Sequence, residues 1–182
     1  MLPAKRSTVT GSASSILTKE TTDIKVSSAT IGKVTDLGVT DVFDMGSVMA
    51  PSAAKTLYEH LKNTNTKPED YDLILTGDLG VYGKSILKEY MSINYNINLD
   101  DNYEDSACII YDRNKQNKVN AGGSGPACIG LVFNSLFYNQ MKSKKLKKVL
   151  LIATGALMSP TMNNQKISIP SISHAVCLEC NL

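Results

Sequence analysis

A run of glycines in the second half of the chain is the feature of this sequence best suited to holding a ligand. Gly122, Gly123 and Gly125 surround Ser124, and an apolar helical pattern follows them. Backbone amides in such a turn, together with the positive end of the helix, favour an anion. The spacing matches neither a P-loop nor a dinucleotide fingerprint. Two interpretations stay open: contact with an anionic ligand, or tight packing where a strand meets a helix.

Two histidines and four cysteines are the other reactive side chains. His174 lies in an apolar stretch that predicts a strand, where a histidine either packs in the wall or binds a ligand. His60 lies on a predicted helix of otherwise surface character, and no histidine pair suits a metal site. Cys177 and Cys180 should face opposite sides of their predicted strand. Cys128, near a helix N-terminus, is either a nucleophile or a small core residue.

The charged side chains of interest lie in turns and at a helix end. Asp78 follows a short apolar segment, and Asp44 precedes a predicted helix; turn or capping chemistry explains both without a ligand. The lysines between Lys142 and Lys148 suit the negative end of a helix, and attraction to a membrane surface is the alternative.

Strand and helix patterns alternate along the chain between these residues. Small, β-branched or apolar runs predict strands over 7–19, 24–36, 71–76, 107–111, 149–153 and 172–179. Apolar spacings of three and four predict helices over 51–62, with Pro51 in the first turn, 83–92 and 129–140. The segments 38–46, 94–102 and 161–168 are predicted loops. This order predicts an α/β layered sheet with mixed strand directions.

Composition excludes several classes of protein. The 182 residues, 42% of them hydrophobic and 20% charged, are typical of one globular domain. A net charge of +2, no Trp and three Phe argue against nucleic-acid binding. The apolar runs are too short to span a bilayer, and no signal-peptide pattern follows the first residues. Four cysteines fit a reducing compartment.

Three stretches of the sequence resemble one known family. They are 29–38 with 44–51, then 70–80, then 121–125 with 151–160 and 169–176. Together they are similar to the stage V sporulation protein AD family of endospore-forming bacteria over roughly residues 7–180. That family resembles thiolases and condensing synthases, whose members have two similar α/β halves.

The resemblance implies that this chain is the C-terminal half of such a protein. Residues 1–20 resemble the last strand of a missing first half. Residues 21–182 are expected to form a thiolase-like domain, in which helices cover a mixed five-stranded sheet.

Two positions depart from the pattern of the condensing enzymes. Gly77-Asp78 stands where a catalytic His is expected, and Gly122-Gly123 stands where an Asn would supply an oxyanion donor. The Cys nucleophile of those enzymes belongs to the first half. Losing the general acid and the oxyanion donor removes interactions that contribute several kcal/mol to such chemistry. The resemblance therefore implies a protein that is not an enzyme, with no catalytic residue, metal or cofactor.

The family resemblance implies binding of dipicolinic acid and its loading into the forespore. Dipicolinate is a planar ring with two carboxylates, so its site needs amides, hydroxyls or a positive group beside an apolar slot. The candidate ligand-binding residues are Gly122, Gly123, Ser124, His174, Met49 and Asp78.

Two other functions remain as alternatives. One is a thiolase-type acyl-transfer enzyme with Cys128 or a partner's Cys as nucleophile. The other is a structural interaction domain that needs a separate first half, which predicts a large exposed apolar face. The implied partners are dipicolinic acid, the other stage V sporulation proteins of the same operon at the forespore membrane, and a homodimer partner or the missing first half. The implied location is cytoplasmic, with peripheral attachment to the spore inner membrane as the alternative.

Overall fold

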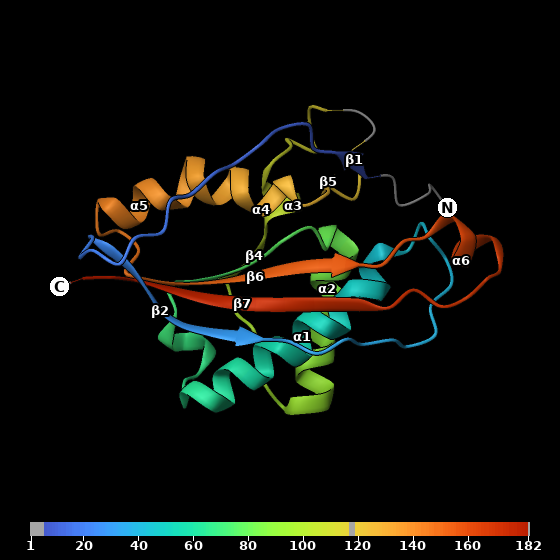
Figure 1. The fold of residues 1–182 in the computed structure, drawn as a ribbon, viewed down its shortest axis with the longest axis horizontal. Coiled ribbons are helices and arrows are strands. Elements are labelled where there is room, and N and C mark those ends of the chain that lie inside the picture. Colours follow the sequence, from blue (N-terminus) through green and yellow to red (C-terminus); the bar gives the residue numbers. More distant parts are fainter. Residues whose placement is uncertain (1–5, 117–118, 182) are drawn as a thin grey trace.

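Five strands form one mixed sheet in the computed structural model, which describes residues 6–116 and 119–181 (Figure 1). Across the sheet, the strands follow the order β2 (Ile24–Ile31), β7 (Ser171–Cys180), β6 (Lys148–Ala156), β3 (Leu73–Thr76) and β4 (Tyr103–Asp105). Strand β3 is parallel to β4 and β6, whereas β7 is antiparallel to β2 and β6. A separate parallel pair joins β1 (Ser7–Thr8) to β5 (Gly123–Ser124).

One face of the sheet is covered by the two long helices, α1 (Met45–Thr64) and α2 (Gly80–Tyr95) (Figure 1). Side chains alternate along each strand, so Ile74 and Ile152 point to this face and join Leu57 and Leu87 in the main core. These four side chains are fully buried, which makes this layer the larger apolar contribution to stability.

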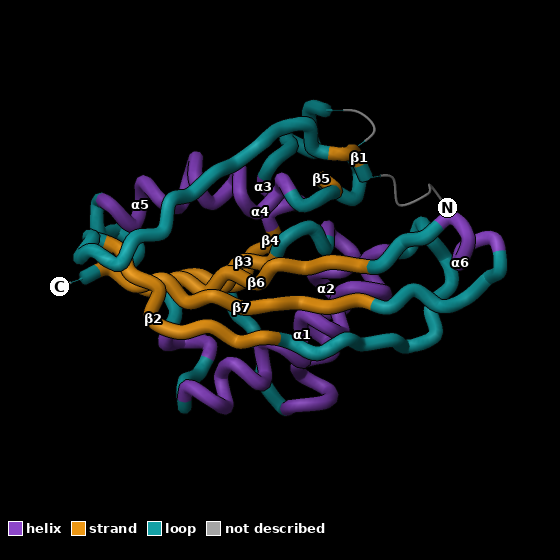
Figure 2. Tube along the Cα trace, in the orientation of Figure 1, coloured by secondary structure: helices purple, strands orange, loops and turns teal. Residues whose placement is uncertain are grey.

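The opposite face is covered by a shorter set of helices, and Figure 2 shows helices on both sides of the strands. The set comprises α3 (Ser106–Ile109), α4 (Ala127–Val132), a π-helical turn (Phe133–Phe137) and α5 (Tyr138–Lys142). Leu73 and Leu75 pack here against Phe137 and Met141. Strand β3 is therefore buried on both faces. A 3₁₀ turn (Pro68–Asp70) and the short helix α6 (Pro160–Asn164) complete the regular structure of the described chain.

The N-terminal segment, residues 6–19, runs along the outer side of α4 and α5 (Figure 1). Its contact with α4 is close, because a Cβ added to Gly130 would lie 2.8 Å from Cβ of Ala13. Farther along, Ser15 donates a hydrogen bond of 3.3 Å to the side chain of Asn134. The segment thus packs on the helical layer instead of joining the five-stranded sheet.

The fold class is confirmed: the protein is α/β, and helices cover a mixed five-stranded sheet. Two predicted strands were wrong. Of residues 7–19, only Ser7–Thr8 form a strand, because the rest of the segment lies on helices and pairs with no strand. Of residues 107–111, the first three lie in α3, because the Asp105 carboxylate accepts the Ala107 amide and caps a helical turn.

One helix prediction and one loop prediction also needed correction. Helix α1 begins at Met45 and not at Pro51, because the Asp44 side chain accepts the Ser47 amide at 3.2 Å and caps it there. Pro51 therefore lies inside the helix. The predicted loop 161–168 contains most of α6.

His60 is fully buried, which contradicts its predicted position on a surface helix. Its Nδ1 lies 2.8 Å from Oγ1 of Thr30, and its Nε2 lies 3.1 Å from the hydroxyl of Tyr71. Burial lowers the pKa of His60. The expectation for the two C-terminal cysteines is confirmed, since Cys177 faces the main core and Cys180 contacts the smaller core on the other face.

Candidate functional site

Asp78, two residues after the end of β3, connects the sheet to the glycine turn. Its Oδ1 accepts a 2.9 Å hydrogen bond from the hydroxyl of Thr154 on β6. Its Oδ2 accepts a 2.8 Å hydrogen bond from the amide of Gly125. The side chain is only 8% exposed, so both bonds form largely out of water. The carboxylate that follows β3 therefore fixes the end of the glycine turn.

The glycine turn has a backbone that other residues adopt only with strain. Gly122 and Gly125 have φ angles of +98° and +105°. A Cβ on Gly122 would also lie 2.9 Å from the carbonyl carbon of Ala107. At Gly123, a Cβ would lie 3.2 Å from Sγ of Cys128. Tight packing, one of the two interpretations of these glycines, is thus a property of the structure.

Much of the turn's main chain is already used inside the molecule. The Gly122 amide donates to the carbonyl of Val119 at 2.9 Å, and the Gly125 amide donates to Asp78. The carbonyls of Gly122 and Ser124 accept the amides of Ser7 at 3.1 Å and Val9 at 2.9 Å. The Ser124 hydroxyl is half-exposed and has no hydrogen-bond partner within residues 6–116 and 119–181. Ser124 is therefore the member of the turn with a polar group free for a ligand.

A second carboxylate, that of Asp105, lies buried behind Asp78. It accepts the amides of Leu79 at 3.0 Å and Gly80 at 2.9 Å at the start of α2, and the hydroxyl of Thr76 at 2.7 Å. Burial raises the pKa of Asp105 despite these hydrogen bonds. Its bonds hold the start of α2 beside the end of β3, and they fix the backbone from which Asp78 projects.

Arg6 provides a cationic side chain beside Asp78. The guanidinium donates hydrogen bonds to the main-chain carbonyls of Asp78 and Leu79. The residue is half-buried, and it directly precedes β1, the strand that pairs with the glycine turn. Positive charge at this site therefore comes from a residue that lies more than a hundred positions before the turn.

His174 lies on β7 and is exposed, so it is a surface residue of the sheet and not a core residue. Its Nδ1 accepts the Gly32 amide at 3.2 Å. Because Nδ1 acts as an acceptor, the neutral ring carries its hydrogen on Nε2. On the neighbouring strand β6, Thr154 pairs with Ser173, so His174 stands next to the strand that contacts Asp78.

The predicted ligand-binding residues thus divide into three groups. The structure brings Gly122, Gly123, Ser124 and Asp78 together at one end of β3, and His174 lies two strands away. Met49 packs in the main core and is 3% exposed, which leaves almost no surface for a ligand to contact.

Sequence reasoning missed Thr154, Arg6 and Asp105 as parts of this site. Thr154 lies within a stretch that carried the family resemblance, but a threonine near the end of a strand gives no signal of its own. Asp105 could have been found as a helix cap, because it stands two residues before a short apolar run.

Cys128 lies beneath the turn and is fully buried. Burial raises the pKa of its thiol to about 12, and the nearby carboxylates of Asp78 and Asp105 act in the same direction. The thiolate is the reactive form of cysteine, and at neutral pH this group is a thiol. The acyl-transfer alternative therefore lacks a nucleophile at Cys128.

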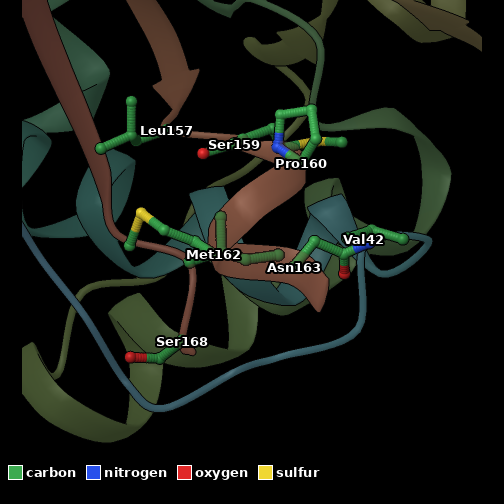
Figure 3. Close-up of a pocket in the computed structure, with 9 residues that line it drawn as sticks. Val42, Leu157, Ser159, Pro160, Met162, Asn163 and Ser168 are labelled. Atoms are coloured by element: carbon green, nitrogen blue, oxygen red, sulfur yellow. The ribbon is translucent and has the colours of Figure 1, made fainter. Parts of the chain in front are cut away.

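A separate apolar pocket of about 270 Å³ lies beyond the ends of β6 and β7 (Figure 3). Leu157, Pro160 and Met162 line it together with Val42 from the loop before α1. None of the six predicted ligand-binding residues contributes to it. Within the described ranges, no three His, Cys, Asp or Glu side chains gather as a metal site would require.

Among the helices of the described chain, none combines the length and the apolar character needed to cross a membrane.

Comparison with known proteins identifies relatives over nearly the whole chain. The family model of stage V sporulation protein AD matches residues 2–179. Stage V sporulation protein AD of Bacillus subtilis (strain 168) is 47% identical over 173 residues, which are 95% of this chain and 50% of the relative. The chain thus spans about half the length of the curated relative it matches.

A solved structure is also similar, that of 3-oxoacyl-[acyl-carrier-protein] synthase III from Aquifex aeolicus. It matches 89% of this chain and 46% of that chain, with a TM-score of 0.48 and 14% identity. A likeness of this size bears on neither function nor site. The family match covers nearly every residue described above, including the glycine turn, Asp78 and His174, and the chain therefore belongs to the stage V sporulation protein AD family of sporulation proteins.

Proposed function

We propose that this chain binds dipicolinic acid, as a non-catalytic step in loading it into the developing spore. Membership of a sporulation family supports the biological setting. The observation that carries the ligand proposal is the free hydroxyl donor of Ser124 in the glycine turn; His174, two strands away, offers a second free donor.

Dipicolinate and these donors match in their chemistry. The dianion offers only acceptors: four carboxylate oxygens and the ring nitrogen. The Ser124 hydroxyl and the Nε2–H of His174 are donors with no partner in the part of the chain that the structure describes. Hydrogen bonds to a charged carboxylate are about twice as strong as neutral ones, so each such donor contributes to holding a small dianion.

The charges around the turn are consistent with an anionic ligand. Asp78 is negative, but both of its oxygens already accept hydrogen bonds from Thr154 and Gly125. The guanidinium of Arg6 lies next to the same residue and opposes its charge. A carboxylate of the ligand therefore meets a donor at Ser124 and a nearby cation, with Asp78 turned inward to the protein.

Calorimetric titration with dipicolinate tests the proposal. Wild-type chain should bind, and Ser124→Ala and His174→Ala should each weaken binding by about tenfold, the expected loss of one hydrogen bond to a charged group. Ser85→Ala is the matched control, because that exposed serine bonds only to Val81 of its own helix. Absence of heat with the wild-type chain, or equal affinity for all four proteins, would refute the proposed ligand site.

A structural interaction domain is the second candidate, and exposed apolar side chains favour it. Ile16 is 95% exposed, Leu17 82% and Ile31 86%. Large apolar groups in water mark contact surfaces when they lie together. The proposed partners are a protein like the half of the Bacillus subtilis relative that this chain does not cover, and the other stage V sporulation proteins of the same operon.

Light scattering after mixing tests the interaction. The second component is the part of the Bacillus subtilis relative that this chain does not cover. A one-to-one complex that Ile31→Ser weakens supports the interaction domain, whereas two separate monomers argue against it.

A further inference from the structure

Arg6 occupies a slot that two glycines leave open where α1 and α2 begin. A Cβ on Gly46 would lie 3.4 Å from Nη2 of Arg6, and a Cβ on Gly80 would lie 3.3 Å from its Nε. The planar guanidinium fits between these backbones and donates to two successive carbonyls, those of Asp78 and Leu79. A forked donor of this kind fixes orientation as well as distance.

No ion pair accounts for the position of Arg6. The three ion pairs within residues 6–116 and 119–181 involve lysines, and none includes Arg6. Its partners are instead main-chain oxygens at the end of β3, so the side chain holds the N-terminal segment to one point of the backbone.

The residues that follow Arg6 hold the glycine turn. Ser7 and Val9 donate their amides to the carbonyls of Gly122 and Ser124 on either side of Gly123. A Cβ on Gly123 would lie 2.9 Å from Cγ2 of Val9, so the turn and the segment are in close contact. Two of the hydrogen bonds that fix the main chain around Ser124 therefore come from the N-terminal segment.

Asp78 connects the two sets of contacts. Its carbonyl accepts from Arg6, and its carboxylate accepts the Gly125 amide at the far end of the turn. Arg6 thus connects the two elements that contact the glycine turn, which are β1 and the Asp78 peptide. Arg6 adds a side-chain anchor to β1, whose other hydrogen bonds include the Ser7 and Val9 amides and a 3.3 Å bond from the Tyr111 hydroxyl to the Thr8 carbonyl. A strand pair of two residues is marginal by itself, so this anchor matters.

We infer that Arg6 is the positioning residue of the glycine turn: by fixing β1 against β5, it holds the Ser124 hydroxyl in the orientation that meets a ligand carboxylate. The ligand part of this inference rests on the proposed function. The positioning part does not, because it concerns the order of the turn in the free protein.

Hydrogen exchange of the Gly122–Gly125 amides, together with dipicolinate titration, tests the inference. Arg6→Ala should speed exchange of this peptide by about tenfold or more, as expected when a charge-assisted contact that closes a local structure is lost. Arg6→Lys should restore part of the protection, because one ammonium replaces one arm of the fork. Arg113→Ala is the matched control, since it removes the chain's other arginine from an exposed turn.

The pattern of results separates positioning from general stability. Fast exchange confined to the turn, with the exchange of β3 unchanged and dipicolinate binding weakened about tenfold, supports the inference. Turn protection equal to wild type in Arg6→Ala would overturn it. If Arg6→Ala unfolds the whole chain, exchange of the Gly122–Gly125 amides is compared instead between the wild type and the folded Arg6→Lys variant. Equal protection of the turn in these two proteins would then overturn the inference.

Failure of the ligand proposal is distinguishable from failure of this one. If the wild-type chain does not bind dipicolinate, the proposed function fails and the exchange data alone judge Arg6. If exchange at the turn rises while dipicolinate affinity stays constant, Arg6 does not position a ligand group and the inference is overturned in its functional part.

Discussion

Replacing Asp78 gives the sharpest test of the site, because its two hydrogen bonds respond differently to two substitutions. Asp78→Asn keeps an oxygen for the Gly125 amide, and its new NH₂ group donates to the Thr154 hydroxyl, which can turn to accept. Asp78→Ala loses both bonds and leaves the Gly125 amide without a partner. The asparagine variant should therefore retain most of the stability that the alanine variant loses.

The magnitudes follow from the strengths of the two bonds. Each is charge-assisted and largely buried, so Asp78→Ala should lower the free energy of unfolding by about 3 kcal/mol. Asp78→Asn exchanges two charged bonds for two neutral ones, at a cost of about 1 kcal/mol. With a urea m-value of about 2 kcal/mol/M, the unfolding midpoints should fall by about 1.5 M and about 0.5 M.

Urea unfolding followed by circular dichroism measures both variants, with Asp101→Ala and Asp101→Asn as controls on an exposed turn. The controls should stay within about 0.5 kcal/mol of wild type. Equal losses for Asp78→Asn and Asp78→Ala would refute the reasoning, because hydrogen-bond exchange at Gly125 and Thr154 would then not determine stability. An Asp78→Ala variant with the same free energy of unfolding as the wild type would also refute the reasoning.

Three further predictions concern the buried groups and the turn. Burial, reinforced by the charge of Lys148, lowers the pKa of His60 from its ordinary 6.5, so the unfolded chain takes up a proton first. The free energy of unfolding should fall as pH drops below about 6.5, and His60→Gln should flatten that fall in pH-dependent urea titrations. Cys128, with its pKa raised to about 12, should resist iodoacetamide at pH ~8 until the chain unfolds, as judged by peptide mass spectrometry. Gly122→Ala should lower the free energy of unfolding by about 3 kcal/mol, because strain adds to the close contact with Ala107. Gly125→Ala should lower the free energy of unfolding by only about 1 kcal/mol, because its Cβ would meet open space and only the positive φ angle is unfavourable. Thermal unfolding of the Gly122→Ala and Gly125→Ala variants measures this difference.

The fold could be predicted from the sequence where a segment had the length and composition of one element type. The segments that became β3 and β6 are short apolar runs of strand length, and buried and less buried residues alternate along most of β7. The run over 107–111 failed because five apolar residues fit either a helix or a strand, and the capping carboxylate of Asp105 decided for the helix. The segment 7–19 failed because β-branched residues favour a strand only when another strand is available to pair with them.

The candidate site could be predicted in part, for a similar reason. Asp78 and the glycine turn both stand at element boundaries, and the sequence shows such positions directly. Thr154 and Arg6 were not predictable, because they reach Asp78 across 76 and 72 residues and carry no local pattern. Met49 was predicted from a family stretch alone, and its apolar side chain is buried as its type favours.

The position of β7 in the sheet has a consequence for the time course of folding. Strand β7 follows the other four strands of the sheet in the sequence but lies between β2, the first of them, and β6, and in the described part of the chain it is the only sheet partner of β2. Roughly 140 further residues must be synthesised after β2 before its partner strand β7 is available. A ribosome-bound chain that ends before β7 therefore leaves β2 and one edge of β6 without a hydrogen-bonding partner. Strand pairing over such a long sequence separation is slow. Until it occurs, the unpaired strand edges make the chains prone to associate with one another. Nascent chains should depend on protection during translation, and loss of the ten-residue strand β7 should separate β2 from the β6-β3-β4 part of the sheet.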